Sequence, residues 1–149
     1  MFPAPAPMRR ALDAARTAAA DGEVPVGAVV TRAGEVIAVA ANAPRTLHDP
    51  TAHAEIRALR AAASALGRER LEDCDLWVTL EPCAMCAGAI AHARIARLYY
   101  AAPDPKGGAV EHGPRLFAQP TIHHRPEVYA GIAEAEAAAL LRAFFRDRR

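Results

Sequence analysis

The chain has 149 residues, which is enough for one domain with a hydrophobic core of its own. Lysine and arginine total 18 against 17 acidic residues, so the net charge of +1 gives no reason to expect nucleic-acid binding except through local clustering. No apolar run approaches the roughly 18 residues of a membrane span, and residues 1–7 lack the pattern of a signal peptide. Three cysteines, two of them in a C-x-x-C, fit metal binding in a reducing compartment better than disulfides. We therefore expect a cytoplasmic protein with no membrane contact, in which residues 1–7 form a flexible tail and residues 8–149 form one domain.

The first half of the chain predicts a hairpin between two helices. The expected helices are 8–20 and 49–66, and the expected strands are 26–31 and 35–41. Arg32-Ala33-Gly34 separates the two β-branched runs and is typical of a hairpin turn. Asp49-Pro50 has the residues of a helix start, with Asp as the N-cap and Pro in the first turn. Gly67 marks the expected end of that helix.

The second half alternates strands with helices. The expected strands are 75–80 and 95–101, and the expected helices are 82–92 and a closing helix from Val128 or Ile132 to the end. The stretch 103–126 is rich in Pro, Gly and His and is expected to be mainly loop, with room for a short strand or turn. This alternation predicts an α/β fold, a three-layer α/β/α sandwich on a mixed sheet.

The strongest chemical signal is a pair of short motifs, His53-Ala54-Glu55 and Pro82-Cys83-Ala84-Met85-Cys86. His53, Cys83 and Cys86 are candidate zinc ligands, and Glu55 is a carboxylate that need not bind the metal. A structural zinc usually has four protein ligands, whereas a catalytic zinc has three and keeps one position for water. The arrangement H-x-E…P-C-x-x-C is also the known signature of zinc-dependent nucleobase deaminases. The two motifs together indicate a catalytic zinc site.

The spacing of these residues sets conditions on the local structure. Cys83 and Cys86 are three apart at an expected helix start, where they can face one side and where free N–H groups favour thiolate. His53 is expected in the first turn of its helix, and an ideal helix would direct it away from Glu55, so one of the two must bend round the helix end. Zinc acidifies bound water, and Glu55 can carry a proton to a ring nitrogen and to the departing amine. The reaction that fits is hydrolytic deamination of an amidine-like ring carbon.

Other interpretations of single residues stay open. A C-x-x-C alone also fits a structural zinc or a redox pair. Cys74 precedes a strand and is expected to be a small, half-buried residue rather than a fourth ligand. His48 is a weak metal candidate whose ring could instead contact a substrate.

Longer runs around these motifs resemble the bacterial tRNA-specific adenosine deaminases of the cytidine deaminase superfamily. The resemblance covers nearly all of the chain, from Arg9 to Arg149. The matching runs are Glu23–Ala28, Asn42, His48–Glu55, Val78–Ala89, Phe144–Arg146 and Arg148-Arg149. Free cytidine deaminases usually have Cys where this chain has His53, which favours the purine branch.

The resemblance implies a homodimer with one Zn²⁺ per subunit, whose two subunits build the active sites together. It also implies that the substrate is a wobble adenosine flipped out of a tRNA anticodon stem-loop. By this resemblance Asn42 hydrogen-bonds the flipped base, and the turn at Val26, Gly27 and Ala28 helps to wall the pocket. From the sequence alone Asn42 could also be a turn residue that ends a strand. Two further pairs match loops that lie against RNA in the family: Asp104 with Lys106, and His124 with Arg125.

The chain departs from the family in the first of these loops. Family members usually have Arg-Asp-x-Lys-Thr-Gly-Ala-x-Gly-Ser, whereas this chain has Pro103-Asp104-Pro105-Lys106-Gly107-Gly108-Ala109-Val110-Glu111-His112. The loss of an Arg and the gain of Glu111 change the charge that this loop offers to a nucleic-acid backbone.

The closing helix carries arginines beside two aromatic residues. Phe144 and Phe145 are expected to be exposed beside Arg142, Arg146, Arg148 and Arg149, which suits the phosphates and stacked bases of a single-stranded loop. Without the resemblance, a solvated helix end would be the simpler interpretation.

Three functions follow from these residues. The first is a zinc-dependent hydrolase that converts adenosine to inosine at the wobble position of a tRNA. The second is deamination of a free base or nucleoside, such as guanine, cytosine or adenosine, for which the altered 103–112 loop is the main argument. The third is a silent subunit that only binds RNA or a partner, but such a subunit would have no use for Glu55.

Overall fold

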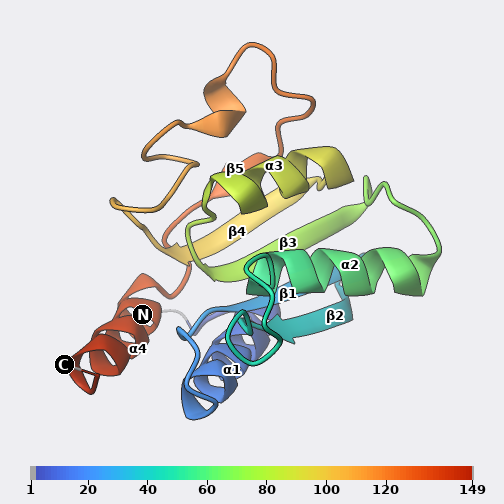
Figure 1. Cartoon of the computed structure of the whole chain (residues 1–149). Coiled ribbons are helices and arrows are strands. Elements are labelled where there is room, and N and C mark those ends of the chain that lie inside the picture. The colour runs from blue at the N-terminus through green and yellow to red at the C-terminus, as the bar shows by residue number, and fades with distance from the viewer. Residues whose placement is uncertain (1–2, 149) are drawn as a thin grey trace.

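A five-stranded mixed sheet forms the centre of the fold (Figure 1). The computed structural model describes residues 3–148. The strands are β1 (Gly27–Arg32), β2 (Glu35–Ala41), β3 (Cys74–Leu80), β4 (Arg97–Ala102) and β5 (Glu127–Tyr129), in the sheet order β2-β1-β3-β4-β5. β1 runs antiparallel to both β2 and β3, whereas β3, β4 and β5 are mutually parallel. The predicted mixed sheet is therefore confirmed.

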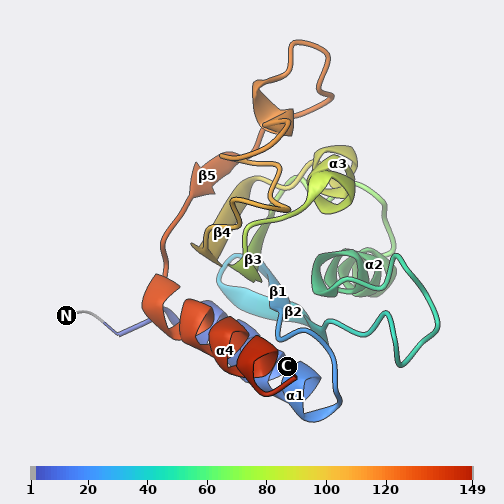
Figure 2. The same ribbon diagram turned by 60° about the vertical axis from the view of Figure 1, so that its left-hand side comes forward.

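Helices cover both faces of this sheet, so the predicted three-layer sandwich is also confirmed. The helices are α1 (Ala6–Ala20), α2 (Ala54–Leu66), α3 (Ala84–Ala93), α4 (Glu134–Arg146) and the short 3₁₀ helix η1 (Leu116–Ala118). Figure 2 shows α1 and α4 side by side on one face, with α2 and α3 on the other. In the part of the chain from 3 to 148, no helix is long and apolar enough to cross a membrane.

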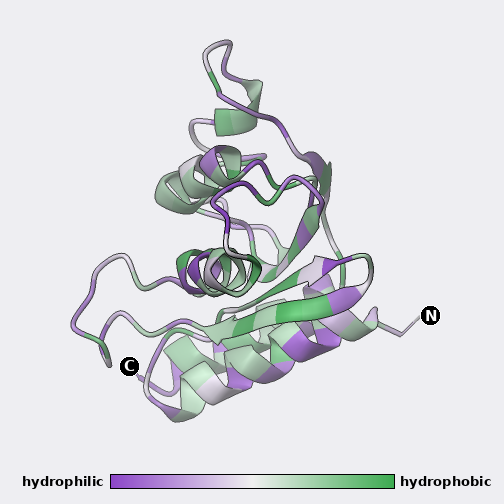
Figure 3. Cartoon of the chain, turned by 90° about the vertical axis from the view of Figure 1, so that its right-hand side faces the viewer, coloured by the Kyte–Doolittle hydropathy of each residue, from purple (hydrophilic) through white to green (hydrophobic). Residues whose placement is uncertain are grey.

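The alternation of side chains along β1 divides the core between the two faces. Ala28 and Val30 pack in a cluster with residues of α2 and α3, while Val29 packs with Met8 and Leu12 of α1. This is the period-two pattern of a strand that is covered on both sides. Figure 3 shows hydrophobic colour concentrated in the strands between the helices.

Helix α1 approaches β1 so closely that Gly27 has no room for a side chain. A Cβ atom at Gly27 would lie 1.9 Å from the Ala11 carbonyl oxygen and 2.7 Å from the Ala15 nitrogen. The Gly27 N–H donates to the hydroxyl of Thr79 at 3.1 Å, which links β1 to β3 beside the site described below.

Several predicted boundaries are correct, but the expected start of one helix is wrong. The hairpin turn lies at Ala33-Gly34, both with positive φ, and α2 ends at Leu66 before a left-handed Gly67. The expected start of α2 at Asp49-Pro50 is wrong because the Asp49 carboxylate accepts hydrogen bonds from the N–H and hydroxyl of Thr51, which makes a turn instead of a helix N-cap. The helix begins five residues later, at Ala54.

The two ends of the chain also differ from expectation. Helix α1 begins at Ala6 with a proline in its first turn, so the expected tail of residues 1–7 overlaps the helix, and Met1, Phe2 and Arg149 lie outside the described residues. The closing helix does not start at Val128, which lies in β5, nor at Ile132, but at Glu134. The stretch 103–126 is loop apart from η1, as predicted.

Candidate metal centre and substrate cavity

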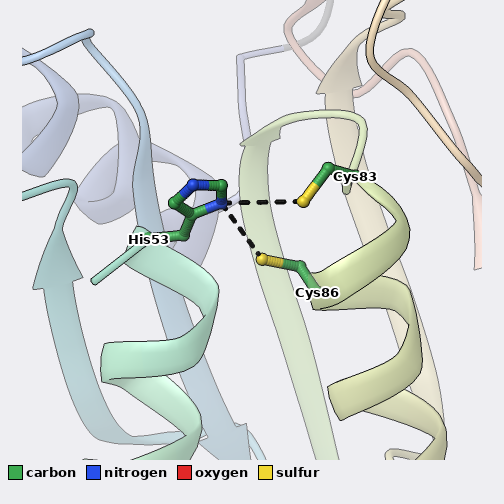
Figure 4. A group of neighbouring side chains, drawn as sticks. All are labelled: His53, Cys83 and Cys86. Atoms are coloured by element: carbon green, nitrogen blue, oxygen red, sulfur yellow. Dashed lines mark hydrogen bonds between the residues drawn. The ribbon is translucent and has the colours of Figure 1, made fainter. Parts of the chain in front are cut away.

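His53, Cys83 and Cys86 lie together where α2 and α3 begin (Figure 4). The Nδ1 atom of His53 is 3.4 Å from the Cys86 sulfur and 3.6 Å from the Cys83 sulfur. The three donor atoms all lie within 4.8 Å of one another. Among residues 3–148 this group includes no fourth His, Cys, Asp or Glu, and the Cys74 thiol contacts Asp73 instead.

Two helix N-caps bring these side chains together. His53 has extended backbone angles, φ −69° and ψ 151°, as the N-cap of α2, so its ring leaves the helix while Glu55 stays in the first turn. This is the bend at the helix end that the two-residue spacing requires. Cys83 is the N-cap of α3, φ −74° and ψ 177°, and Cys86 lies in the first turn. The free N–H groups of a helix start favour negative charge on these sulfurs.

The electrostatics of the three side chains match a metal-binding set. Hydrogen bonds from the Cys86 thiol and from the His53 ring lower the pKa of Cys83 to about 4. The bond to Cys83 in turn raises the pKa of His53, and the neighbouring Cys83 sulfur raises the pKa of Cys86. Two sulfurs and one imidazole nitrogen are the donors that zinc prefers, and three of them make the set of a catalytic rather than a structural site. The residues therefore fit zinc.

Glu55 is buried next to this group without belonging to it. Only 4% of the residue is exposed. Burial raises the pKa of Glu55 to about 7, and the negative charge of Cys83 acts in the same direction. A carboxyl group whose pKa lies near neutrality can both accept and return protons at physiological pH.

A cavity of about 300 Å³ opens beside the metal-binding group. Its walls come from five segments of the chain: Val24, Val26, Asn42, Pro44, His53, Glu55, Leu80, Glu81, Cys83, Asp104 and Gly107. A larger cavity of about 770 Å³ shares Val24, Leu80 and Asp104 with it and extends to the end of α4. The metal centre is therefore reached through a small cavity that continues into a wider one.

Of the predicted pocket residues, Asn42 and Val26 line the smaller cavity, while Gly27 and Ala28 do not. Asn42 is 8% exposed, and its backbone N–H donates to the Val26 carbonyl at 2.9 Å. Gly27 instead packs against α1, and Ala28 is fully buried in the core. Sequence reasoning missed Val24, which lines both cavities.

The predicted loop residues divide into two groups. Asp104 lines both cavities, and Lys106 lines the larger one. His124 and Arg125 line neither: the His124 ring contacts the Ile95 carbonyl at 2.7 Å, and the Arg125 guanidinium donates to the carbonyls of Phe117 and Gln119. This second pair holds its own loop in place within this chain.

The aromatic residue of α4 that faces the cavity is Phe145 rather than Phe144. Phe144 is buried, with 7% exposure, and the Arg148 guanidinium covers its ring at 3.7 Å, so the expectation that it is exposed is wrong. Phe145 is 51% exposed and lines the larger cavity together with Arg148. Arg146 is exposed and lines an adjoining groove with Arg142.

Sequence reasoning missed two buried carboxylates that hold loops beside the cavity, and one of them, Glu81, also lines it. Glu23 accepts hydrogen bonds from Thr46 and from the Arg45 N–H, which fixes the loop after Asn42. Glu81 accepts hydrogen bonds from the loop around Asp104. Burial opposes the ionisation of Glu81, but backbone donors, Asp104 first, hold its pKa below the usual range. The signal in the sequence was a single Glu directly before Pro82, with no visible partner.

Comparisons with known proteins agree with this geometry. Residues 4–102 match the cytidine and deoxycytidylate deaminase zinc-binding region, and the chain belongs to this family. It is 60% identical over 142 residues to a tRNA-specific adenosine deaminase of Agrobacterium fabrum, covering 95% of this chain and 93% of the relative. A structure from a study of A-to-I editing by tRNA:A34 deaminases at the wobble position of transfer RNA superimposes with a TM-score of 0.90 at 59% identity, covering 91% of this chain and 98% of that one. A guanine deaminase from Nitrosomonas europaea superimposes with a TM-score of 0.81 at 25% identity, covering 97% of this chain and 86% of that one.

Proposed function

We propose that this protein is a zinc-dependent hydrolase that converts adenosine to inosine at the wobble position of a tRNA anticodon. The observation that carries the proposal is a buried carboxylate, Glu55, beside three converging zinc donors at the floor of a cavity. The proposed substrate comes from the relatives, since a protein named for tRNA adenosine deamination shares 60% of its residues with this chain over almost the full length of both.

The proposed ligands are His53, Cys83 and Cys86, with one zinc per subunit. Zinc at this position supplies a Lewis acid that makes water a nucleophile near neutral pH and stabilises developing negative charge. Glu55, buried and with a pKa near 7, accepts a proton from the attacking water and delivers it to a ring nitrogen; it then accepts the proton of the new hydroxyl group and delivers it to the departing amine. Ammonia leaves and a carbonyl remains on the ring.

The small cavity suits a single flipped base. Its volume of about 300 Å³ is at the lower end of the range of ligand sites. Asn42 is a polar residue of its wall, next to the apolar residue Val26, and we assign it the hydrogen bonds to the base edge. A base inside a duplex cannot reach such a site, so an unpaired loop nucleotide is the natural substrate.

The wider cavity would receive the RNA around that base. Lys106 and Arg148 supply positive charge for phosphates, and Phe145 supplies a surface for stacking. Glu111, the acidic departure from the family loop, accepts a hydrogen bond from the Tyr100 hydroxyl. Neither cavity is lined by Glu111, so this departure does not oppose the proposed RNA contact there.

A homodimer in the cytoplasm is part of the same proposal. An apolar groove lies between α2 and α3, lined in part by Ile56, Leu59 and Ala89. On α3 a Cβ atom added at Gly88 would meet nothing within 4 Å, and Met85 is 37% exposed. An open helix face of small residues supports close packing against a second copy across a two-fold axis.

The decisive experiment compares substrates on the purified zinc-loaded protein. We expect inosine in an anticodon stem-loop with a wobble adenosine, none in the same stem-loop with adenosine one position away, and little ammonia from free adenosine, guanine or cytosine. Release of ammonia from guanine without editing of the stem-loop would replace this proposal by the free-base alternative, for which the similarity to guanine deaminases is the present support.

A further inference from the structure

The side chain of Glu81, between the end of β3 and the metal-binding helix, is completely buried and accepts five hydrogen bonds from a single loop. One carboxylate oxygen accepts from the Asp104 N–H at 3.0 Å and contacts the His112 ring at 2.7 Å. The other oxygen accepts from three consecutive backbone N–H groups, at Val110, Glu111 and His112, at 3.0–3.1 Å. Successive N–H groups that converge on one point form an anion-binding nest, and here the anion is part of the protein.

The loop held in this way carries a wall of the substrate cavities. Asp104 and Gly107 line the small cavity, and Asp104 and Lys106 line the wide one. The Asp104 carboxylate accepts from the N–H groups of Lys106 and Gly107, so its position determines theirs. Gly108 lies directly on Glu81, where an added Cβ atom would be 2.5 Å from the carboxylate.

Four of the five hydrogen bonds come from backbone groups. The path of the loop therefore depends on Glu81 more than on the side chains of the loop. This explains how the stretch 103–112 can depart from the family pattern at several positions and still place Asp104 and Lys106 at the cavities. Of the five hydrogen bonds to Glu81, only the one from the His112 ring involves a side chain of the loop.

We propose that Glu81 is a positioning residue that fixes the 104–112 loop against the substrate cavities and so determines how tightly the enzyme binds its substrate. The inference rests on the proposed function for the identity of that substrate. Glu81 lies at the wall of the small cavity, but its hydrogen bonds go to the loop and none goes to a metal donor. It acts through Asp104 and Lys106.

The test is the kinetics of Glu81→Gln. The amide is nearly isosteric with the carboxylate. Its NH₂ group, however, would replace one of the two oxygens and would leave the N–H groups that donate to that oxygen without an acceptor. We expect KM for the stem-loop to rise by about tenfold or more, which is the scale of a hydrogen bond to a charged group, while zinc content stays at the parental level and kcat changes less. A merely structural defect would reduce the active fraction, and thus kcat, without moving KM.

Two further variants make the result unambiguous. Gly108→Ala places a methyl group against the Glu81 carboxylate and is expected to displace the loop and raise KM in the same way. This variant also tests the proposal if Glu81→Gln does not fold. Glu111→Gln is the control, since its side chain contacts Tyr100 and its amide oxygen can still accept that hydrogen bond, so KM is not expected to rise. Parental KM in both Glu81→Gln and Gly108→Ala, or a loss of activity that follows zinc content alone, would overturn the proposal. If the parent protein deaminates only free bases, KM is measured on that base, and the two proposals are decided separately.

Discussion

The carboxyl group of Glu55 is enclosed beside two sulfurs and an imidazole, and this enclosure determines its chemistry. An exposed carboxyl group would be ionised at neutral pH and could not return a proton efficiently. Burial places its pKa near 7, where both forms are available. Because Glu55 is not one of the metal donors, its role in proton transfer and the effect of its raised pKa on stability can be tested separately, without removing a metal ligand.

Glu55→Gln removes proton transfer and leaves the metal donors in place. We expect turnover to fall by about 10²–10⁴-fold, the usual range for general acid–base catalysis, while zinc content stays at the parental level. Metal analysis and single-turnover editing on the same sample measure the two effects. Near-parental turnover in this variant would assign the proton transfer to another group.

The raised pKa also predicts a pH effect on stability. Burial raises the pKa of Glu55 from the ordinary 4.5 to about 7, so the folded state favours the protonated form. The contribution of this group to stability is therefore fully present below about pH 4.5 and is lost as the pH rises through 7, a change on the order of 3 kcal/mol. In zinc-depleted protein, the unfolding free energy should fall more between pH 5 and pH 8 in the parent than in Glu55→Gln. If urea unfolding gave the same pH dependence of the unfolding free energy for the parent and for Glu55→Gln, this prediction would be wrong.

At the scale of elements, a helix end with one clear local signal could be predicted, whereas a boundary with two competing local signals and the contacts between distant segments could not. Gly67 ends α2 because glycine adopts the left-handed conformation without strain. The start of α2 was misplaced because Asp49 forms a turn with Thr51, a competing local hydrogen bond that the same residues allow. The carboxylates of Glu23 and Glu81 bind segments more than 20 residues away, and nothing local announces such partners.

Helix α4 illustrates how a one-residue shift changes a functional assignment. Successive helical residues point about 100° apart, so when Phe144 packs into the core, Phe145 faces the cavity. The sequence identifies the aromatic pair and its arginines. Which of the two phenylalanines is buried depends on how α4 packs against α1 and β4. Glu136 of α4 forms ion pairs with Arg9 and Arg16 of α1 at this contact.

The arginines of α4 predict a salt-dependent contribution to RNA binding. Replacing Arg146 and Arg148 by Gln should weaken stem-loop binding and flatten the log–log salt dependence by about 0.7–0.9 per lost phosphate contact. Since Arg148 also covers Phe144, the single variant Arg146→Gln separates charge from packing. Fluorescence anisotropy across a salt series measures the slope. Arg70→Gln, which removes one charge away from α4, is the control for Arg146→Gln. An unchanged slope in the double variant would show that this helix end is only solvated.

At the scale of the whole molecule, the two faces of the sheet have different surroundings. On the side of α1 and α4, a cavity is lined by Phe145 and Arg148 and leads toward the metal-binding group. On the other side, α2 and α3 leave an apolar groove between them. The first surface suits RNA, and the second suits a copy of the same chain, so substrate and partner would not compete for one surface.

A single charge in the second groove tests this assignment. Ala89 lines the groove on α3, and Glu is compatible with a helix, so Ala89→Glu should fold while placing an unpaired charge in the dimer contact. Light scattering should give twice the 15.8 kDa chain mass for the parent and the single chain mass for the variant. Ala139→Glu, at an exposed position of α4, is the matched control and should remain dimeric. A monomeric parent at working concentration would reject the homodimer, whereas a dimeric Ala89→Glu protein would move the contact to another surface.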